Sequence, residues 1–400
     1  MDSRTEQQAP VLDAAFMADP FDLYDRLRDA APVCEVRLPG GARAWLVTRY
    51  ADVRAALTDP RLSMDSRNAG HKRWGGLPLP RELRANLFNM DAPDHTRVRG
   101  LIAHAFGRRR MEDLQTAIEG EADRLLDAMA ARGRADLIAE FAVPLPFMVI
   151  CDLLGVTGGD RAGFRHWADE MFAGEAYAQP ERVRDAVGSI VGFLQELIAD
   201  KRARPGDDLL SDLVRARDGD GRLSEPELTA LAFLVLLAGY ENSTNMIGNG
   251  VLALLRHPGQ LAKLRARPDL ITTAVDELLR YDSPANVALR RFPLVPVEIG
   301  GVPIPAGEQV LLSFASANRD PARFPGAADL DVERADNPHV ALGHGPHYCV
   351  GAPLARLEGR IAIGKLLDRF PRLALAVPAA SLNWRPSVRN HGLAELPVVF

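Results

Sequence analysis

The side chains best suited to metal or redox chemistry lie in one short segment near the C-terminal end of the chain. The stretch ALGHGPHYCVGAPLAR, residues 341–356, contains one Cys and two His among three Gly. Glycine permits tight or left-handed backbone and leaves little bulk beside the sulfur of Cys349. The segment alone allows three interpretations: a reactive thiol, a thiolate that binds a haem iron, or a zinc site. The zinc site would take its ligands from His339, His344, His347 and Cys349.

The position of Cys349 in front of a helix favours a stabilised thiolate. Helical periodicity predicts a helix over Ala352–Arg369. Backbone N–H groups and the positive end of the helix dipole stabilise a negative sulfur at this position. An anionic axial ligand of haem iron needs such an environment, because it must stay deprotonated and accept hydrogen bonds.

A second candidate for chemistry is a polar run inside the most apolar helix of the chain. Ser224 to Glu227 forms a predicted capping box, and the helix is expected over Glu225–Arg256. Residues 228–238 are apolar on all sides except for Thr229, which is typical of a helix through the middle of a large protein. The sequence AGYENSTN follows at residues 238–245. Because buried polar groups cost free energy unless they find partners, this run indicates an internal site.

Composition places the chain among soluble globular proteins. Of 400 residues, 47% are hydrophobic and 25% are charged, and the net charge of −5 gives no reason to expect nucleic acid binding. Cys34, Cys151 and Cys349 are odd in number and widely spaced, which suits a reducing cytoplasm rather than a disulfide framework. We expect no signal peptide and no membrane anchor, because the apolar run Leu228–Gly239 is too short to cross a bilayer.

The elements that must position these residues are mostly helices. Strand-like alternation is limited to a hairpin at Val33–Thr48 around Gly40-Gly41 and to two further segments, Arg291–Phe314 and Leu373–Phe400. No linker divides the chain, so we predict a mainly α protein with small β-sheets and a single domain over residues 1–400. The predicted helices are Phe21–Asp29, Tyr50–Leu57, His95–Ala105, Met111–Ala131, Arg182–Ala203, Glu225–Arg256, Gln260–Arg265, Leu270–Tyr281 and Ala352–Arg369.

The Cys349 loop resembles the haem-binding signature of the cytochrome P450 family, Phe-x-x-Gly-x-x-x-Cys-x-Gly. Residues 342–351 match it with Leu342 in place of the usual Phe and with Gly351 as the last Gly. The resemblance covers nearly the whole chain and closely follows the bacterial soluble members. It implies the cytochrome P450 fold, a single large haem domain, and haem b bound through Cys349 as the metal ligand.

The resemblance also implies a group of residues that hold the haem propionates. His95 and Arg99 are four residues apart and therefore lie on one face of a helix. Arg291 and His347 match the other propionate-binding positions of the family. Cations beside carboxylates are reasonable physically, because the cofactor brings two negative charges into a protein core.

A structural ion network is implied by Glu277-Leu278-Leu279-Arg280, which matches the Glu-x-x-Arg pattern of the family. Arg334 resembles the third member of the network. The pattern is weak alone, because Glu121…Arg124 also fits it and an ordinary helix surface produces such pairs. Its position upstream of the Cys349 loop is what distinguishes Glu277 and Arg280.

The polar run resembles the motif of the family that binds oxygen and supplies protons. Ala238, Gly239 and Glu241 agree with that motif, but Asn242 replaces the usual Thr and is followed by Ser243. An amide can order a water molecule but is a poor substitute for a hydroxyl in a proton relay. Three alternatives stay open: Asn242 holds a water for Glu241, Ser243 substitutes for the Thr, or the substrate provides a hydroxyl.

The resemblance implies a haem-thiolate monooxygenase that inserts one atom of O2 into a largely hydrophobic organic substrate, by hydroxylation or epoxidation, in bacterial secondary metabolism. A non-catalytic haem sensor or carrier and an enzyme of oxidative coupling are the alternatives. A flexible segment around residues 67–87 is expected to complete the pocket. Its other predicted lining residues are Leu234, Leu237, Val287, Ala288, Leu289 and Leu393.

No flavin or nicotinamide fingerprint occurs at a position that could function, so electrons should come from NAD(P)H through a ferredoxin and a ferredoxin reductase. A basic patch on the thiolate side could bind an acidic redox partner. Its predicted members are Arg97, Arg108–Arg110, Arg356, Arg360 and Lys365.

Overall fold

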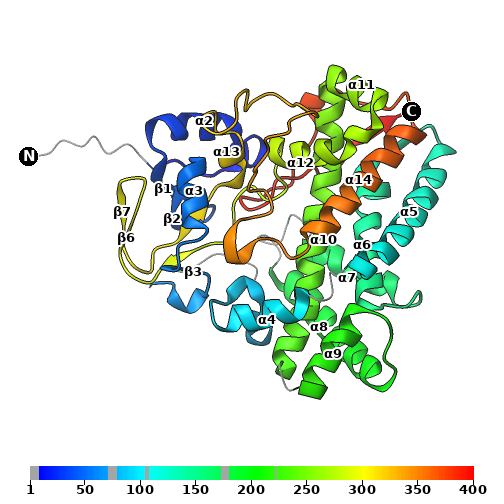
Figure 1. Ribbon diagram of the computed structural model, residues 1–400, viewed down its shortest axis with the longest axis horizontal. Helices are drawn as coiled ribbons and strands as arrows, with labels where there is room; N and C mark the ends of the chain where they lie inside the picture. The colour runs from blue at the N-terminus through cyan, green and yellow to red at the C-terminus, as the bar shows by residue number, and fades with distance from the viewer. Residues whose placement is uncertain (1–8, 71–78, 104–107, 173–179, 221–222) are drawn as a thin grey trace, which may run out of the picture.

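The computed structural model describes residues 9–70, 79–103, 108–172, 180–220 and 223–400. Figure 1 shows long helices gathered around α10, with the first helices and the strands within residues 33–47 and 297–304 on the opposite side of the molecule. The mainly α class with small sheets is therefore confirmed. The helices are α1 (Ala14–Ala18), α2 (Phe21–Ala30), α3 (Tyr50–Ala56), α4 (Asp94–Ala103), α5 (Arg108–Ala130), α6 (Pro144–Leu154), α7 (Arg161–Phe172), α8 (Pro180–Ala203), α9 (Leu209–Asp220), α10 (Glu225–Arg256), α11 (Pro258–Ala266), α12 (Ile271–Tyr281), α13 (Phe314–Asn318) and α14 (Ala352–Arg369).

The sheets are short, and most of them join distant parts of the chain. In one sheet β1 and β2 are antiparallel, with Val33 opposite Val47, and β2 pairs in parallel with β8. The predicted hairpin is confirmed, and its turn uses Gly40 and Gly41 at φ of 84° and 86°, where other residues would be strained. The strands are β1 (Val33–Arg37), β2 (Arg43–Val47), β3 (Leu62–Ser63), β4 (Arg134–Asp136), β5 (Phe292–Pro293), β6 (Val297–Ile299), β7 (Val302–Ile304), β8 (Val310–Leu312), β9 (Ala374–Leu375) and β10 (Pro397–Val399).

Helix α10 has the predicted bounds and packs against α6, α12 and α14. Ser224 and Glu227 form the predicted capping box, in which the Glu227 carboxylate accepts from the Ser224 N–H at 2.7 Å. Gly239 lies where α10 crosses α6, and a β-carbon there would come within 2.4 Å of the Ile150 side chain. The helix is continuous through this residue. Close packing on α6 is thus one physical reason for glycine in the centre of the helix.

Three long helices, α6, α7 and α9, were not predicted. Helix α6 is apolar on nearly every side and is buried, so it lacks the polar face that a periodicity analysis needs. The predicted helix His95–Ala105 corresponds to α4, and the remainder of that prediction falls on residues 104–107, outside the described part. Among the described residues, no helix combines the length and the apolar character needed to cross a membrane.

Candidate active site

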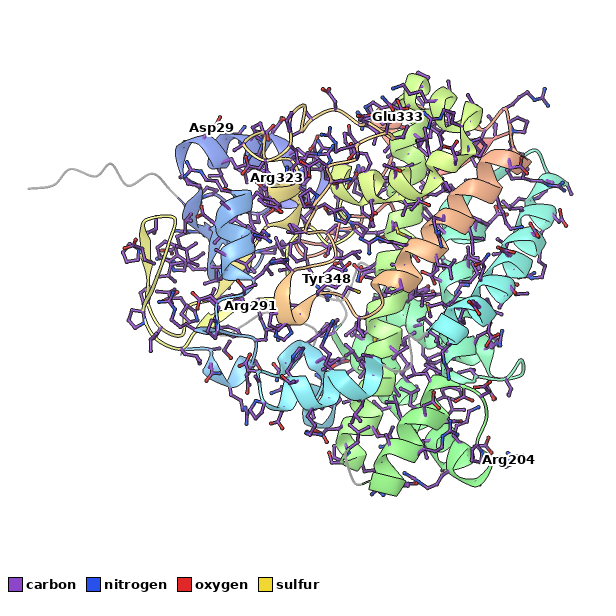
Figure 2. All side chains as sticks on the ribbon, in the orientation of Figure 1. Asp29, Arg204, Arg291, Arg323, Glu333 and Tyr348 are labelled. Carbon is purple, nitrogen blue, oxygen red and sulfur yellow. The ribbon has the colours of Figure 1, made fainter. Side chains whose placement is uncertain are left out.

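A cavity of about 1550 Å³, its open mouth included, lies between α10 and the loop before α14. Figure 2 shows Tyr348 on that loop, beside α10. The predicted site residues that line the cavity are Leu234, Ala238, Gly239, Asn242, Ser243, His95, Arg99, Val287, Ala288, Leu289, Arg291, Leu342, His347, Cys349 and Gly351.

The backbone of the Cys349 loop depends on its glycines. Gly343 and Gly345 have φ of 78° and 70°, and a β-carbon at Gly345 would lie 2.6 Å from the Thr58 side chain. The Cys349 N–H donates to the Leu342 carbonyl at 2.8 Å, which closes the loop. Burial raises the pKa of the Cys349 thiol, although the Gly351 N–H opposes this effect. A thiolate at this position therefore requires a cation beside it, as a metal ion would provide.

Four nitrogen-bearing side chains converge on the cavity wall. His95 and Arg291 are each 3% exposed, and the rings of His95 and His347 lie 3.9 Å apart between centroids. Burial, followed by the proximity of His95, Arg291 and Arg99, lowers the pKa of His347 to about 3. Burial also lowers the pKa of Arg291 to about 10, against the opposing effect of Asp91. Because Arg99 and Arg291 bring positive charge to this wall, the site would bind a negatively charged group.

A haem fits this donor set. Cys349 would provide the ligand for the iron, and the cluster of His95, Arg99, Arg291 and His347 would meet two carboxylates. When bound, the haem supplies the activation of oxygen. The zinc interpretation is not supported, because the described part of the chain contains no group of three or more potential zinc ligands. His339 instead lies with its Nε2 atom 3.2 Å from the Asp276 carboxylate.

The residues of the polar run separate onto two sides of α10. Asn242 and Ser243 line the cavity, about one turn beyond Ala238 and two turns beyond Leu234. Glu241 does not line it, and its carboxylate accepts a hydrogen bond from Asn390 Nδ2 at 2.6 Å. The Asn242 amide donates to the Ala238 carbonyl at 3.3 Å, while its Oδ1 atom has no hydrogen-bond partner among the described residues. Asn242 Oδ1 is thus a buried acceptor without a partner in the described part of the chain.

Glu358 is a site residue that the sequence analysis missed. It lies on α14, lines the cavity, is 1% exposed and accepts a hydrogen bond from the Ser243 hydroxyl at 2.5 Å. Burial raises its pKa to about 8, although the Ser243 bond opposes the shift. One signal was present in the sequence: an acidic residue at a position that the apolar pattern of α14 assigns to the core. Ser243 therefore interacts with Glu358 rather than with Glu241.

The raised pKa of Glu358 predicts a stability difference that depends on pH. An unfolded Glu titrates near 4.5 and the folded one near 8, so ionisation destabilises the native protein progressively across this interval. Glu358→Gln should therefore gain stability relative to the wild type as the pH rises, on the order of 4 kcal/mol by pH 8. Denaturant unfolding from pH 5 to 8 measures this difference. Glu298→Gln, at an exposed position, is the control substitution, and a flat profile for Glu358→Gln would contradict the prediction.

The predicted ion network lies in the core, away from the cavity. Glu277 and Arg280 have fully buried side chains, and two parallel hydrogen bonds of 2.7 Å join them. Arg334 donates to the same carboxylate at 3.1 Å. Arg280 also donates to three backbone carbonyls between residues 318 and 329. The network thus joins α12 to the segment that leads toward the Cys349 loop.

Two predicted pocket residues do not line the cavity. Leu237 lies about 100° around α10 from Ala238 and packs against the core instead. Leu393 is 1% exposed and pairs through its backbone with Trp384. Of the predicted segment 67–87, Leu87 lines the cavity, and residues 71–78 lie outside the described part.

The charges of the predicted basic patch are largely paired within the chain. Arg97 bonds to Glu227, Arg110 to Asp212, Arg356 to Asp276 and Lys365 to Asp123, at distances of 2.5 to 2.8 Å. The side chains of Arg108 and Arg109 lie outside the described part. Because these ion pairs reduce the positive potential, the patch is weaker than the sequence alone suggested.

Comparisons with known proteins agree with this site. Residues 171–375 match the family model for cytochrome P450. The chain is 45% identical to the cytochrome P450 monooxygenase PikC of Streptomyces venezuelae, over 98% of this chain and 95% of that protein. It is 44% identical to a vitamin D(3) 25-hydroxylase of Pseudonocardia autotrophica, over 98% and 96% of the two chains. The structure of the tirandamycin C-bound P450 monooxygenase TamI superimposes with a TM-score of 0.90 at 42% identity, over 98% and 99%.

These matches extend over nearly the full length of this chain, and the expected cytochrome P450 fold is confirmed by them. They also agree with the expectation of a monooxygenase. The chain therefore belongs to the cytochrome P450 family, and its activity is that of a P450 monooxygenase.

Proposed function

We propose that the enzyme hydroxylates or epoxidises a largely apolar product of secondary metabolism. The observation that carries this proposal is the composition of the cavity wall. On its α10 side, the cavity wall consists mostly of aliphatic and aromatic side chains, and Ser243 and Asn242 are polar exceptions. The apolar lining residues include Phe88, Leu234, Val235, Val287, Ala288 and Leu289. Such a lining binds apolar surface at about 25 cal/mol per Å².

The names of related proteins support the same substrate class. They include a 6-deoxyerythronolide B hydroxylase, a mycinamicin IV hydroxylase/epoxidase and a pentalenic acid synthase. TamI has been solved with tirandamycin C. A polyketide or terpenoid skeleton would suit both these relatives and the apolar cavity.

As a P450 enzyme, the protein uses haem and O2 and receives electrons from redox partners. We infer that the haem is haem b, ligated by Cys349 and held at its propionates by His95, Arg99, Arg291 and His347. We further infer that electrons pass from NAD(P)H through a ferredoxin reductase and a ferredoxin in the cytoplasm. The absence of disulfides among Cys34, Cys151 and Cys349 suits that compartment.

A screen of polyketides, terpenoids and peptides for ligands that shift the Soret band tests the substrate class. Ligands that bind would then be incubated with NADPH, ferredoxin, reductase and O2. We expect a product that has gained one oxygen atom. Binding without oxygen-dependent turnover would indicate a sensor or carrier, and a product that has lost hydrogen without gaining oxygen would indicate oxidative coupling. Either result would overturn the proposal.

We also propose that Asn242 orders a water for proton delivery, because the residue lines the cavity and its Oδ1 atom has no hydrogen-bond partner among the described residues. Asn242→Ala removes both amide atoms and should lower the amount of product formed per electron pair by up to roughly 100-fold, the low end of a general acid–base contribution. Asn242→Thr restores a hydroxyl and should recover most of this coupling. The measurement compares NADPH consumed with product formed. Unchanged coupling in both variants would remove Asn242 from proton delivery.

A further inference from the structure

Arg389 is a charged residue of the cavity wall that neither the propionate-binding residues nor the Glu358 pair explains. It comes from the C-terminal segment and lines the cavity together with Val287, Ala288 and Leu289. Its side chain is half-buried in this largely apolar surface. A cation in such surroundings costs free energy unless it contributes to binding or to structure.

Hydrogen bonds from Asn286 fix the backbone of Arg389. The Asn286 N–H donates to the Arg389 carbonyl at 2.8 Å, and the Asn286 amide donates to the Val388 carbonyl at 3.1 Å. Asn286 is 1% exposed and accepts in turn from the Tyr24 hydroxyl at 2.7 Å. The Arg389 side chain therefore starts from a fixed point on the wall, which lowers the entropy that a bound ligand would cost.

An aromatic ring of the cavity wall lies next to the guanidinium. The Cζ atom of Arg389 is 5.8 Å from the centroid of the Phe88 ring, and Phe88 also lines the cavity. The Phe88 N–H donates to Asn86 Oδ1 at 2.8 Å, and Asn86 is 3% exposed, so the ring is also well positioned. A cation–π contact stabilises a guanidinium at an apolar surface but brings no negative charge to it.

Two further arginines belong to the same charged region. Burial, followed by the positive charges of Arg389 and Arg84, lowers the pKa of Arg290 to about 9. Like charges have this effect on one another only when they are close. The residues predicted to hold the propionates are not among the causes of this shift, so Arg84, Arg290 and Arg389 form a second cationic cluster, the Arg389 cluster. Arg84 is exposed and Arg389 lines the cavity, so the cluster extends from the surface to the cavity wall.

The described cavity wall offers little negative charge in return. Glu358 is the one acidic residue that lines the cavity among those that the structure describes, and it bonds to Ser243. Because burial raises the pKa of Glu358 to about 8, this carboxyl is largely neutral at neutral pH. Two propionates would balance Arg99 and Arg291, but they would leave the charge of Arg389 on the wall. A negative charge on the substrate would balance it.

We propose that the Arg389 cluster binds a carboxylate of the substrate, and that the substrate of this enzyme is therefore an apolar organic acid. Arg389 donates two parallel N–H bonds to the carboxylate oxygens, the geometry that a guanidinium offers. Arg290 and Arg84 add positive charge that attracts an anion toward the cavity. The apolar body of the acid then lies against the aliphatic part of the wall. The inference rests on the proposed function and narrows its substrate class.

Matched pairs of an acid and its methyl ester isolate the contribution of the charge. The probes are dodecanoate and the diterpenoid acid abietate, each compared with its methyl ester, and the shift of the Soret band at neutral pH gives the Kd. We expect each acid to bind roughly ten- to 100-fold more tightly than its ester, the effect of hydrogen bonds between charged groups. Equal or weaker binding of the acids, or binding of neither form, would overturn the proposal.

Substitutions in the cluster test whether Arg389 causes this preference. Arg389→Met removes the charge and should abolish the preference for acids, while the Kd of the esters stays as in the wild type. Arg389→Lys keeps the charge without the two-point geometry and should keep part of the preference. Arg84→Gln, at an exposed position where folding is not at risk, should weaken acid binding alone and by less than Arg389→Met. Arg385→Met is the matched control, because Arg385 lies on the same segment but does not line the described cavity. An unchanged preference in Arg389→Met and Arg84→Gln would overturn the proposal.

Turnover separates failure of this inference from failure of the proposed function. If acids and esters bind equally and either gains one oxygen atom, the enzyme oxygenates apolar substrates without selecting for charge, and only the inference is wrong. If the acids bind with the expected preference but no bound ligand is oxygenated, the proposed function fails, whereas recognition of a carboxylate by the Arg389 cluster stands.

Discussion

Replacement of Cys349 by Ser should abolish the long-wavelength Soret band of the reduced carbon monoxide complex, the spectral mark of thiolate ligation. Cys349 is the only Cys whose side chain lines the described cavity, since Cys34 lies on β1 and Cys151 lies in the core of α6. A hydroxyl has a far higher pKa than a thiol and is a much weaker electron donor, so it cannot replace the thiolate. We expect turnover to fall to background because the electron-rich sulfur favours O–O cleavage.

Cys34→Ser is the matched control for this substitution. Its side chain is half-buried on β1, and burial raises the pKa of its thiol to about 11, so it is expected to be a neutral structural residue. The control should keep the native spectrum and nearly native turnover. If Cys349→Ser keeps the band, or if Cys34→Ser loses it, the assignment of the iron ligand is wrong.

The parts of the site that the sequence predicted are those with local patterns. The Cys349 loop, the His95 and Arg99 pair, and the Glu277 and Arg280 pair each lie within a few residues, and the resemblance to the cytochrome P450 family implied their roles. Helix α10 was predicted with its bounds because its capping box and apolar face are also local. Predictions from such local patterns need only the residues of a single helix or loop.

The interactions that could not be predicted from the sequence join residues far apart in the chain. The bond between Ser243 and Glu358 spans 115 residues, and the bond between Glu241 and Asn390 spans 149. Neighbouring positions in AGYENSTN looked like one catalytic group, but a turn of 100° per residue sends Glu241 and Asn242 to different surroundings. Only packing against α14 and the C-terminal segment determines which polar side chain meets which partner.

Replacement of Arg280 by Met should prevent accumulation of folded, haem-containing protein. Arg280 has a fully buried side chain and bonds to Glu277 and to the carbonyls of Asn318, Ala327 and Asp329, at 2.7 to 2.9 Å. Its loss leaves a buried carboxylate without its main counter-charge, although Arg334 still reaches it, and leaves three carbonyls without a donor. Breaking a buried pair in this way costs about 3–5 kcal/mol, a large fraction of the stability of a typical protein.

The chain contains a second Glu-x-x-Arg pair that provides a control for Arg280→Met. Arg124 and Glu121 also follow the Glu-x-x-Arg pattern and are joined at 2.6 Å, but the Arg124 side chain is 64% exposed. Exposed pairs contribute about 0–1 kcal/mol, so Arg124→Met should change the melting temperature very little. The measurements are the yield of soluble protein, the haem content and the thermal unfolding of both variants. The two pairs share their sequence pattern and hydrogen-bond geometry and differ in burial. If only Arg280→Met fails to fold, burial gives the network its structural role. If the two variants behave alike, that explanation is wrong.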